Sequence, residues 1–329
     1  MTTKDYNTNN SESFQSNRLK ETSNAIKAEA LRLGFFSCGI AKAEPVDDEE
    51  RNEYMQRVKA HSYAAMDYMY RNIEKRLDPT LLVPGTKSII SVAMNYAPSV
   101  KQDEKGYKLA SYALGRDYHV IMKEKLRALA KKFNWEEDSY RVFVDTAPVL
   151  ERYWAARAGL GWIGKNNLLI IPHAGTMFFL GEIFVNFDLA YDKPGENHCG
   201  RCSRCIENCP THALSTHPFD ASLCLSYQLI ENRGELSENA KKAMGDTIYG
   251  CDRCQQACPW NRFSTPTTEP ELQPSSDLLA MKKEDWQNLD VEKYRKLFKG
   301  SAVKRAKYEG LMRNIKAASM NDEDNESED

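Results

Sequence analysis

Apolar and polar residues alternate along the first 190 residues with spacings that switch repeatedly between helical and extended. Between Arg18 and Gly34 the apolar residues recur at helical intervals and the glycine provides a stop, so this stretch predicts an amphipathic helix. The apolar run 35–41 predicts a buried strand, and the β-branched run 87–96 predicts a strand in the middle of a sheet. Such alternation is typical of an α/β domain.

The alternation continues as far as residue 187. The pattern predicts helices at 47–75, 117–133 and 149–158 and strands at 140–144, 167–171 and 177–187. Asp145 stands between a strand and a helix, where an acid either caps the helix or takes part in catalysis, and the pattern does not decide between these roles. We expect Cys38 to be a small core residue. We expect His119 and His212 to be structural, because no histidine pair has metal-ligand spacing.

Three segments and two tails make up the predicted organisation. The segment 1–17 has few large apolar residues and is expected to be a disordered tail, as is the acidic end 321–329. Between them we predict an α/β catalytic domain at 18–190, a cysteine-rich domain at 191–265 and a helical basic segment at 266–320.

A G-x-G-x-x-G pattern at Gly159, Gly161 and Gly164 matches the form of a dinucleotide-binding fingerprint. That fingerprint must follow a strand and open a helix, whereas this one follows a predicted helix and leads into a strand. We therefore exclude a Rossmann interpretation. We expect these glycines to let backbone approach a large flat ligand, or to turn the chain.

Eight of the nine cysteines lie between Cys199 and Cys258. The first four have the C-x2-C-x2-C-x3-C-P spacing of bacterial ferredoxins, in which three thiolates bind one [4Fe–4S] cluster and the fourth crosses to a second cluster. Applying this crossing at both ends of the segment predicts two [4Fe–4S] clusters. The predicted ligands are Cys199, Cys202, Cys205 and Cys258 for the first cluster and Cys209, Cys224, Cys251 and Cys254 for the second.

Zinc and disulfides are the alternatives to clusters. A zinc site built from Cys202/Cys205 and Cys251/Cys254 would leave four cysteines unexplained. Disulfides require an oxidising compartment, but the chain begins with the polar MTTKDYNTNN and not with a basic and apolar leader, so we expect the cytoplasm. No stretch approaches the roughly 18 to 20 apolar residues that cross a bilayer, so we expect a soluble protein without a membrane role.

Charge is distributed unevenly. The net charge is −2, and six acids lie in 321–329, so the rest of the chain is at +4. Within it, residues 293–316 hold nine Lys or Arg and one acid, Glu309. A basic segment of this kind binds phosphates in some proteins, although a run of charges is more often the solvated face of a helix.

Taken together, several segments resemble the epoxyqueuosine reductase family, which uses cobalamin in the last step of queuosine synthesis on tRNA. The resemblance runs from about Ile26 to Ala317. Its most specific pieces are EKRLDP at 74–79, GRDYH at 115–119, VDT at 144–146, RAGLG at 157–161 with Lys165-Asn166, DASLCLSY at 220–227, YGCDRCQ at 249–255, CPWN at 258–261 and the cysteine spacing itself.

This resemblance implies a fold and a reaction. The fold would be a nitroreductase-like α/β (α+β) cobalamin-binding domain, a ferredoxin-like domain with two [4Fe–4S] clusters and a short helical C-terminal segment. As an oxidoreductase, the protein would pass electrons from an external low-potential donor through the clusters to cobalamin, and would reduce epoxyqueuosine to queuosine at the wobble position of tRNA. We expect a monomer.

The resemblance also implies site residues. Asp145 matches the proton donor of the family, and its pKa would be raised in a dry pocket so that it keeps its proton near neutrality. The implied cobalamin contacts are Arg76, Asp145, Lys165, Asn166, Leu169, Leu180, Ser226 and Asp252. For the anticodon stem-loop of the tRNA, the candidate contacts in the basic segment are Lys304, Arg305 and Arg313.

Two other functions fit part of the pattern. A reductive dehalogenase-like enzyme would share the clusters and cobalamin but would act on a small molecule and would not need the basic segment. A non-catalytic iron–sulfur protein would only transfer electrons to a partner. Binding of cobalamin separates the enzymes from the electron-transfer protein.

Overall fold

A four-stranded antiparallel sheet forms the centre of the structure, a computed structural model that describes residues 4–326. The strand order is β1-β2-β7-β4. The strands span Ser37–Lys42 (β1), Ser88–Asn95 (β2), Phe178–Val185 (β7) and Tyr140–Phe143 (β4). The two central strands, β2 and β7, are buried along almost their whole length, which is why they appear as predominantly apolar runs in the sequence.

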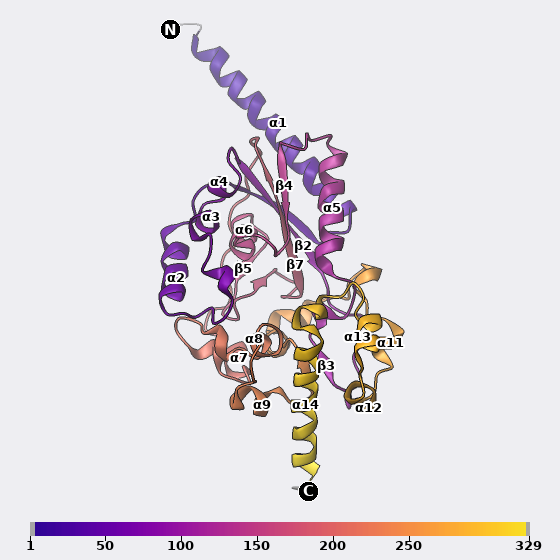
Figure 1. The fold of residues 1–329 in the computed structure, drawn as a ribbon. Coiled ribbons are helices and arrows are strands. Elements are labelled where there is room, and N and C mark those ends of the chain that lie inside the picture. The colour runs from indigo at the N-terminus through magenta and orange to yellow at the C-terminus, as the bar shows by residue number, and fades with distance from the viewer. Residues whose placement is uncertain (1–3, 327–329) are drawn as a thin grey trace.

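Helices cover both faces of this sheet (Figure 1). On one face, α1 (Lys4–Arg32) and α5 (Tyr118–Lys132) contribute apolar side chains such as Ile26 and Leu126 to a buried cluster with β2 and β7. On the other face, α6 (Glu151–Arg157) packs against the same strands, with the side chain of Trp154 fully buried. The predicted α/β domain is therefore a three-layer arrangement around an antiparallel sheet.

The region 47–75 differs from the single helix that we expected. It forms α2 (Asp48–Lys59), a 3-10 turn η1 (Asp67–Met69) and α3 (Ile73–Leu77), followed by α4 (Pro79–Leu82). The backbone is left-handed at His61, Ala64 and Asn72, and an α-helix cannot continue through such residues. None of the three is a glycine, so the sequence carries no ordinary signal for these breaks.

The start of α1 also differs from expectation, because residues 4–17 are helical where we predicted disorder. This helix contains neither glycine nor proline. Its C-terminal half is fixed by the buried side chains of Ile26 and Ala30, and extending a fixed helix adds one hydrogen bond for each residue ordered. Residues 1–3 of the predicted tail lie outside the described residues.

The G-x-G-x-x-G segment leads into a small hairpin of β5 (Trp162–Ile163) and β6 (Leu169–Ile170). A Cβ at Gly161 would lie 2.0 Å from the carbonyl oxygen of Ile170, so only glycine permits this approach. Gly159 has φ +78° and turns the chain. In this structure the two glycines serve the folding of the chain's own backbone.

The cysteine-rich segment is built from short elements around loops. These are α7 (Arg204–Glu207), α8 (Leu225–Ile230), α9 (Glu238–Met244), β8 (Thr247–Tyr249) and α10 (Arg253–Gln256). Strand β8 pairs in parallel with β3 (Lys108–Leu109), which belongs to the first predicted domain. This pairing ties the two domains together.

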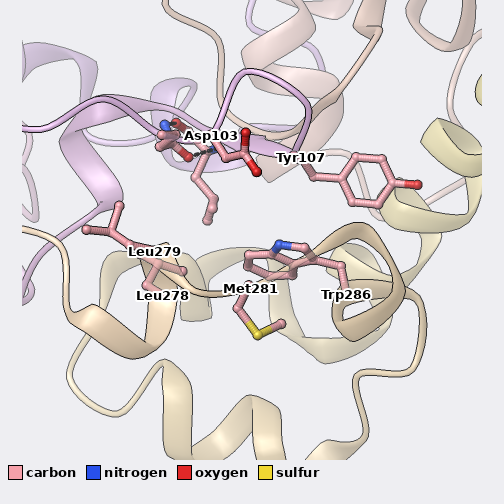
Figure 2. A pocket seen from close by; sticks show the side chains of 9 residues that line it. Asp103, Tyr107, Leu278, Leu279, Met281 and Trp286 are labelled. Atoms are coloured by element: carbon pink, nitrogen blue, oxygen red, sulfur yellow. Dashed lines mark hydrogen bonds between the residues drawn. The ribbon is translucent and has the colours of Figure 1, made fainter.

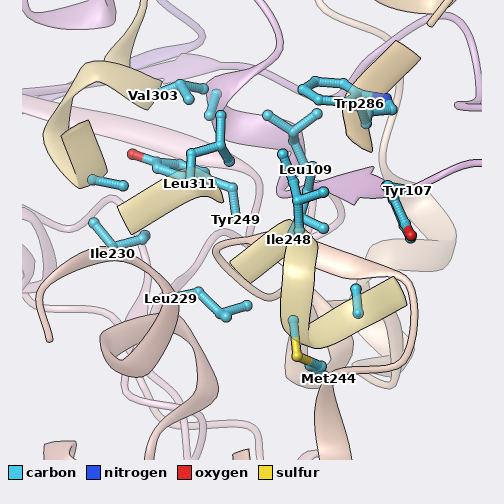
Figure 3. Close-up of a cluster of buried hydrophobic side chains, with 14 of the residues drawn as sticks. Tyr107, Leu109, Leu229, Ile230, Met244, Ile248, Tyr249, Trp286, Val303 and Leu311 are labelled. Carbon is cyan, nitrogen blue, oxygen red and sulfur yellow. The ribbon is translucent and has the colours of Figure 1, made fainter. Parts of the chain in front are cut away.

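Four C-terminal helices complete the fold: α11 (Ser276–Leu279), α12 (Lys283–Gln287), α13 (Val291–Leu297) and α14 (Lys307–Glu326). They share one hydrophobic core with the cysteine-rich segment and with β3, and Leu109, Leu229, Ile248, Trp286 and Leu311 meet there (Figure 3). The predicted segments 191–265 and 266–320 thus have a common core. Helix α14 continues into the predicted acidic tail, of which 327–329 lie outside the described residues.

A small pocket lies between residues 102–109 and helices α11 and α12 (Figure 2). Its acid, Asp103, pairs with Lys282 at 3.3 Å, and its lining contains no cysteine. Among residues 4–326, none of the helices combines the length and apolar character needed to cross a lipid bilayer.

Candidate metal centres and active site

The eight clustered cysteines come together as two groups of four. In one group, Cys205 interacts electrostatically with Cys199, Cys258 and Cys202, and in the other, Cys254 interacts with Cys251, Cys224 and Cys209. Burial raises the pKa of both thiols, and the neighbouring thiols of the same group add to the increase. These are the two ligand sets that the crossing pattern predicts, and four thiolates for each set suit a [4Fe–4S] cluster.

This arrangement disfavours the alternatives to clusters. All nine cysteines are free thiols. The proposed zinc tetrad is divided, because Cys202 and Cys205 belong to one group and Cys251 and Cys254 to the other. In the part of the chain that the structure describes, no three His, Cys, Asp or Glu side chains are placed to hold a single metal ion. A cube of iron and sulfur needs more widely spaced thiolates than one zinc ion does.

A pocket contains all four thiols of the first group. Lys165, Asn166, Trp260 and the side chain of Ile170 line it together with these cysteines. The indole Nε1 of Trp162 lies 3.4 Å from Sγ of Cys199, and such N–H donors to sulfur tune the potential of a cluster. The ammonium of Lys165 donates to the carbonyl oxygens of Gly200 and Cys202, at 2.7 and 3.0 Å, and so fixes the loop that carries the first ligands.

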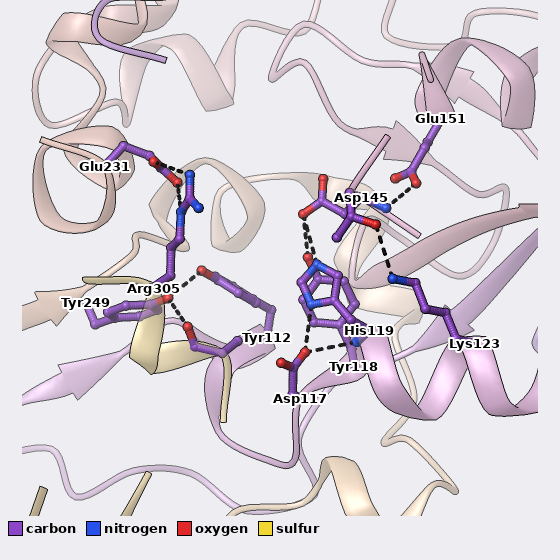
Figure 4. A network of polar contacts seen from close by, with 12 residues as sticks. Tyr112, Asp117, Tyr118, His119, Lys123, Asp145, Glu151, Glu231, Tyr249 and Arg305 are labelled. Carbon is purple, nitrogen blue, oxygen red and sulfur yellow. Dashed lines mark hydrogen bonds and ion pairs between the residues drawn. The ribbon is translucent and has the colours of Figure 1, made fainter. Parts of the chain in front are cut away.

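Asp145 occupies the loop between β4 and α6, and its side chain is 60% exposed. The hydroxyl of Tyr118 donates to Oδ2 of Asp145 at 2.7 Å, and Nε2 of His119 lies 3.5 Å from the same oxygen (Figure 4). The opposite ring nitrogen, Nδ1 of His119, lies 2.7 Å from Oδ1 of Asp117. These contacts form an acid–imidazole–acid chain that ends at an exposed carboxylate.

The protonation states of Asp145 and His119 differ from expectation. Although the Asp145 side chain reaches solvent, the protein around it removes part of its hydration and favours the neutral form; the hydrogen bonds from His119 and Tyr118 outweigh this effect and hold its pKa below the ordinary value. The expected increase is therefore wrong for this state of the protein. Burial opposes the charge on His119, yet its hydrogen bonds to Asp117 and Asp145 raise its pKa to about 9. At neutral pH the proton of the pair resides on His119.

His119 thus belongs to the candidate site, although we expected it to be only structural. It was missed because its partner Asp145 is far away in the sequence and because no metal-ligand spacing points to it. The available signal was the GRDYH motif, which places a tyrosine and a histidine at the start of α5. There, Asp117 caps the helix and directs both side chains towards the end of β4.

Tyr68 contacts both Arg76 and Arg305. Arg76 is buried and donates to the carbonyl oxygen of Tyr68 at 3.0 Å, while its Nε has no hydrogen-bond partner. The guanidinium of Arg305 lies 5.8 Å from the centre of the Tyr68 ring and forms two hydrogen bonds with Glu231, at 2.7 and 2.8 Å. Both Tyr68 and Arg305 interact electrostatically with Asp145.

The other predicted cofactor contacts are more dispersed. Asn166 is buried and its Nδ2 has no partner, whereas Leu169 and Leu180 pack in the core beneath α6. Ser226 is half-buried on α8. The carboxylate of Asp252 is used internally, since it accepts hydrogen bonds from the backbone of Ser111 at 2.6 Å and from Gln255 at 3.2 Å.

The three predicted RNA contacts have different surroundings. Lys304 and Arg305 are exposed. Arg313 is half-buried, and its guanidinium donates to the backbone carbonyl oxygens of Gln228, Asn232 and Gly234. These bonds attach α14 to the end of α8 and engage the guanidinium that we expected to contact a phosphate.

Two family models match the chain. One, described as epoxyqueuosine reductase QueG, covers residues 76–146, and the other, a 4Fe-4S double cluster binding domain, covers residues 198–261. The chain is 45% identical over 302 residues to the epoxyqueuosine reductase of Cellulophaga algicola, an alignment that covers 91% of this chain and 98% of the relative. It is 39% identical over 310 residues to the enzyme of Escherichia coli, covering 91% of this chain and 81% of the relative.

Solved structures agree with these matches. A crystal structure of epoxyqueuosine reductase with an epoxyqueuosine-modified tRNA stem loop superposes with a TM-score of 0.83 at 26% identity, covering 91% of this chain and 80% of that one. The Bacillus subtilis enzyme, with its catalytic aspartate loop swung out of the active site, gives a TM-score of 0.82 at 25% identity, covering 91% and 81%.

Proposed function

The chain belongs to the epoxyqueuosine reductase family, and on this premise we propose that it reduces epoxyqueuosine to queuosine at the wobble position of tRNA. The observation that carries the proposal is the alignment with the Cellulophaga algicola enzyme, which spans 98% of that enzyme at 45% identity. Removing the epoxide oxygen as water consumes two electrons and two protons. The chain must therefore hold an electron path and a proton source.

The two thiol groups provide the electron path in this proposal. The match to a double-cluster domain supports two [4Fe–4S] clusters, with Cys199, Cys202, Cys205 and Cys258 binding the first and Cys209, Cys224, Cys251 and Cys254 binding the second. An external low-potential donor would supply the electrons. Because Trp162 contacts Cys199 and Lys165 fixes its loop, the first cluster would sit in an ordered, partly apolar setting.

Cobalamin is the proposed cofactor that meets the substrate. The residues present fit such a group, because the Nε of buried Arg76 and the Nδ2 of buried Asn166 are donors without a protein partner. An amide-rich macrocycle offers the acceptors that these donors lack. When bound, a low-valent cobalt centre would supply the reducing electrons at the substrate carbon. Ser226 and Asp252 are the further residues that would contact it.

Asp145 and its neighbour His119 would supply the proton. As oxygen leaves carbon, negative charge develops on it and must be neutralised by a proton. The charged His119 holds that proton at Nε2, 3.5 Å from Oδ2 of Asp145, and Asp145 projects from its loop towards solvent. In this proposal His119 passes its proton to the Asp145 carboxylate, which delivers it to the leaving oxygen, and the second proton that completes water comes from solvent.

The tRNA would approach along the exposed cations near the site. Arg305 is held in place by Glu231 and Tyr68, so its position relative to Asp145 is defined, and Lys304 is adjacent in sequence. Phosphates of an anticodon loop would bind such cations, while the modified base turns inward to reach Asp145. The crystal structure of a relative with an epoxyqueuosine-modified tRNA stem loop supports tRNA as the partner.

The test is anaerobic incubation of the reconstituted protein with epoxyqueuosine-containing tRNA, cobalamin and a strong reductant, followed by nucleoside analysis. We expect epoxyqueuosine to be replaced by queuosine. Asp145→Asn is the matched variant, expected to bind iron and cobalamin at wild-type levels and to lose turnover. A wild-type protein with both cofactors bound that leaves epoxyqueuosine unchanged would refute the proposed function.

A further inference from the structure

A carboxyl group is buried at the centre of the main sheet. Glu182 on β7 has no exposed surface, and neither of its carboxyl oxygens makes a hydrogen bond of acceptable geometry. Its cross-strand partners are Ser91 on β2 and Phe143 at the end of β4. The hydroxyl of Ser91 is also buried without a partner. An apolar side chain at this position would make the fold more stable than the unpaired carboxyl does. The presence of Glu182 therefore requires a reason other than stability.

A second acid, Glu151, packs towards Glu182 from the helix above. Glu151 is the first residue of α6, one turn before Trp154 on the face of α6 that is buried against the sheet. Leu180 and Phe184 lie two residues on either side of Glu182 and belong to the same buried cluster as Trp154. Burial and then the Glu151 carboxyl raise the pKa of Glu182 well above its ordinary value.

Glu151 in turn binds the backbone of the proton donor. Its Oε1 accepts a hydrogen bond from the backbone N–H of Asp145 (Figure 4). Asp145 has φ +52°, a left-handed conformation that is unfavourable for a residue with a Cβ. The loop continues through tight turns, in which Thr146 donates to Val144 and Val149 donates to Ala147. The strained backbone of the donor therefore depends on an acceptor supplied by α6.

We propose that Glu151, supported from below by Glu182, is a positioning residue for Asp145: it anchors the backbone of this loop so that the Asp145 carboxylate meets Tyr118 and His119. This inference rests on the proposed function for its consequence in turnover, but the anchoring itself does not require any activity. In a structure of the Bacillus subtilis relative the catalytic aspartate loop is swung out of the active site.

The pairing of half-buried Glu151 with buried Glu182 explains how the anchor stays in place. The charged groups that act on Glu151 are Asp145, His119 and Arg152, and those that act on Glu182 are Glu151 and Asp145. Burial, followed by the charge of Asp145, raises the pKa of Glu151 to about 8. At neutral pH both glutamates are therefore mostly protonated. A neutral carboxyl still accepts an N–H through its carbonyl oxygen, and two neutral carboxyls do not repel each other.

The first experiment compares Glu151→Ala with Glu151→Gln. Alanine removes the acceptor, whereas glutamine keeps a carbonyl oxygen in the same place. We expect peptides that contain Asp145 to exchange amide hydrogen faster in Glu151→Ala than in the wild type, and Glu151→Gln to restore slow exchange. In the tRNA reaction, kcat should fall about tenfold or more in Glu151→Ala with little change in KM, and should recover in Glu151→Gln.

The second experiment separates positioning from stability. Replacing Glu182 by leucine removes a buried polar group without a partner, so Glu182→Leu should unfold at the same temperature as the wild type or at a higher one. Its turnover should nevertheless fall, and exchange at Asp145 should become faster. Turnover and hydrogen exchange in Glu182→Gln should lie between those of Glu182→Leu and the wild type. Glu137 is exposed, and Glu137→Ala serves as the control for turnover and for hydrogen exchange.

The outcomes distinguish this inference from the proposed function. Equal hydrogen exchange at Asp145 in the wild type and in folded Glu151→Ala, with the same iron content, would overturn the positioning role whatever the reaction proves to be. Slow exchange that depends on Glu151, in a wild type that leaves epoxyqueuosine unchanged, would support the anchor and refute the proposed function. A Glu182→Leu variant that keeps full turnover would overturn the part assigned to Glu182.

Discussion

The hydroxyl of Tyr118 lies 2.7 Å from Oδ2 of Asp145, and its ring stacks on Phe179 at a centroid distance of 4.0 Å with an interplanar angle of 3°. The stack fixes the ring, so the hydroxyl is presented to the carboxylate without further loss of side-chain freedom. Tyr118 is thus a rigid link between the apolar core and the exposed acid. Its two contacts can be separated by substitution.

Tyr118→Phe removes the hydroxyl and keeps the stacked ring. We expect kcat for epoxyqueuosine reduction to fall about tenfold or more, because Asp145 loses the hydrogen bond that orients its carboxylate. Iron content, cobalamin binding and melting temperature should match those of the wild type, since the contact with Phe179 persists. Turnover at the wild-type rate would show that the hydroxyl does not orient Asp145.

Asp117→Asn tests the charge on His119. The carboxylate of Asp117 helps to raise the pKa of His119 to about 9, so a neutral amide should lower it, while still capping α5 through its side-chain oxygen. A histidine with a raised pKa keeps its proton until the pH passes that value. We therefore expect activity to be lost above about pH 9 in the wild type and at lower pH in Asp117→Asn.

The measurement pairs a pH–rate profile with an NMR titration of the histidine ring protons. Both should move to lower pH together in Asp117→Asn. If the rate profile stays in place while the titration of His119 moves, the proton of His119 is not the one used in turnover.

Much of this fold could be predicted from the sequence, because β2 and β7 are buried strands with predominantly apolar runs and α5 has both a cap and a helical period. The breaks in 47–75 could not, since left-handed conformations at His61 and Ala64 carry no glycine signal. Tertiary contacts fix those turns; for example, the backbone N–H of Tyr63 donates to the hydroxyl of Tyr70.

The candidate site was predictable to different degrees. Cysteine spacing identifies thiol groups because ligand geometry is local and repeats. The network around Asp145 is not local: Tyr118 comes from α5, Glu151 from α6 and Glu182 from β7. Glu182, a single acid in the apolar run of β7, was the available signal for its pairing with Glu151. Only the register of the sheet places Glu182 next to the loop that carries Asp145.

Paired cysteine substitutions test the crossing of ligands between clusters. Cys199 and Cys258 are assigned to the same cluster, so Cys199→Ala/Cys258→Ala should leave about four of about eight irons. Cys199 and Cys209 are assigned to different clusters, so Cys199→Ala/Cys209→Ala should lose nearly all iron. Ligation without crossing predicts the reverse order, which iron analysis after anaerobic reconstitution would reveal. Cys38→Ala is the control and should keep all iron, since burial within the sheet raises the pKa of this thiol to about 12.

Arg305→Ala and Arg313→Ala separate an exposed cation from a half-buried one that is bonded to backbone. Arg305 is anchored by Glu231 beside Tyr68, and its removal also exposes the Glu231 carboxylate to approaching phosphates. We expect Arg305→Ala to weaken binding of the tRNA stem-loop about tenfold at low salt, and to reduce the slope of log Kd against log salt concentration by about one.

Arg313→Ala should instead lower the melting temperature, because several backbone carbonyl oxygens at the end of α8 lose their donor, and should leave the salt slope unchanged. A stem-loop titration over a salt series, with melting curves for both variants, checks this. An unchanged salt slope in Arg305→Ala would mean that the tRNA binds another surface of the protein, whereas a reduced slope in Arg313→Ala would mean that Arg313 contacts a phosphate.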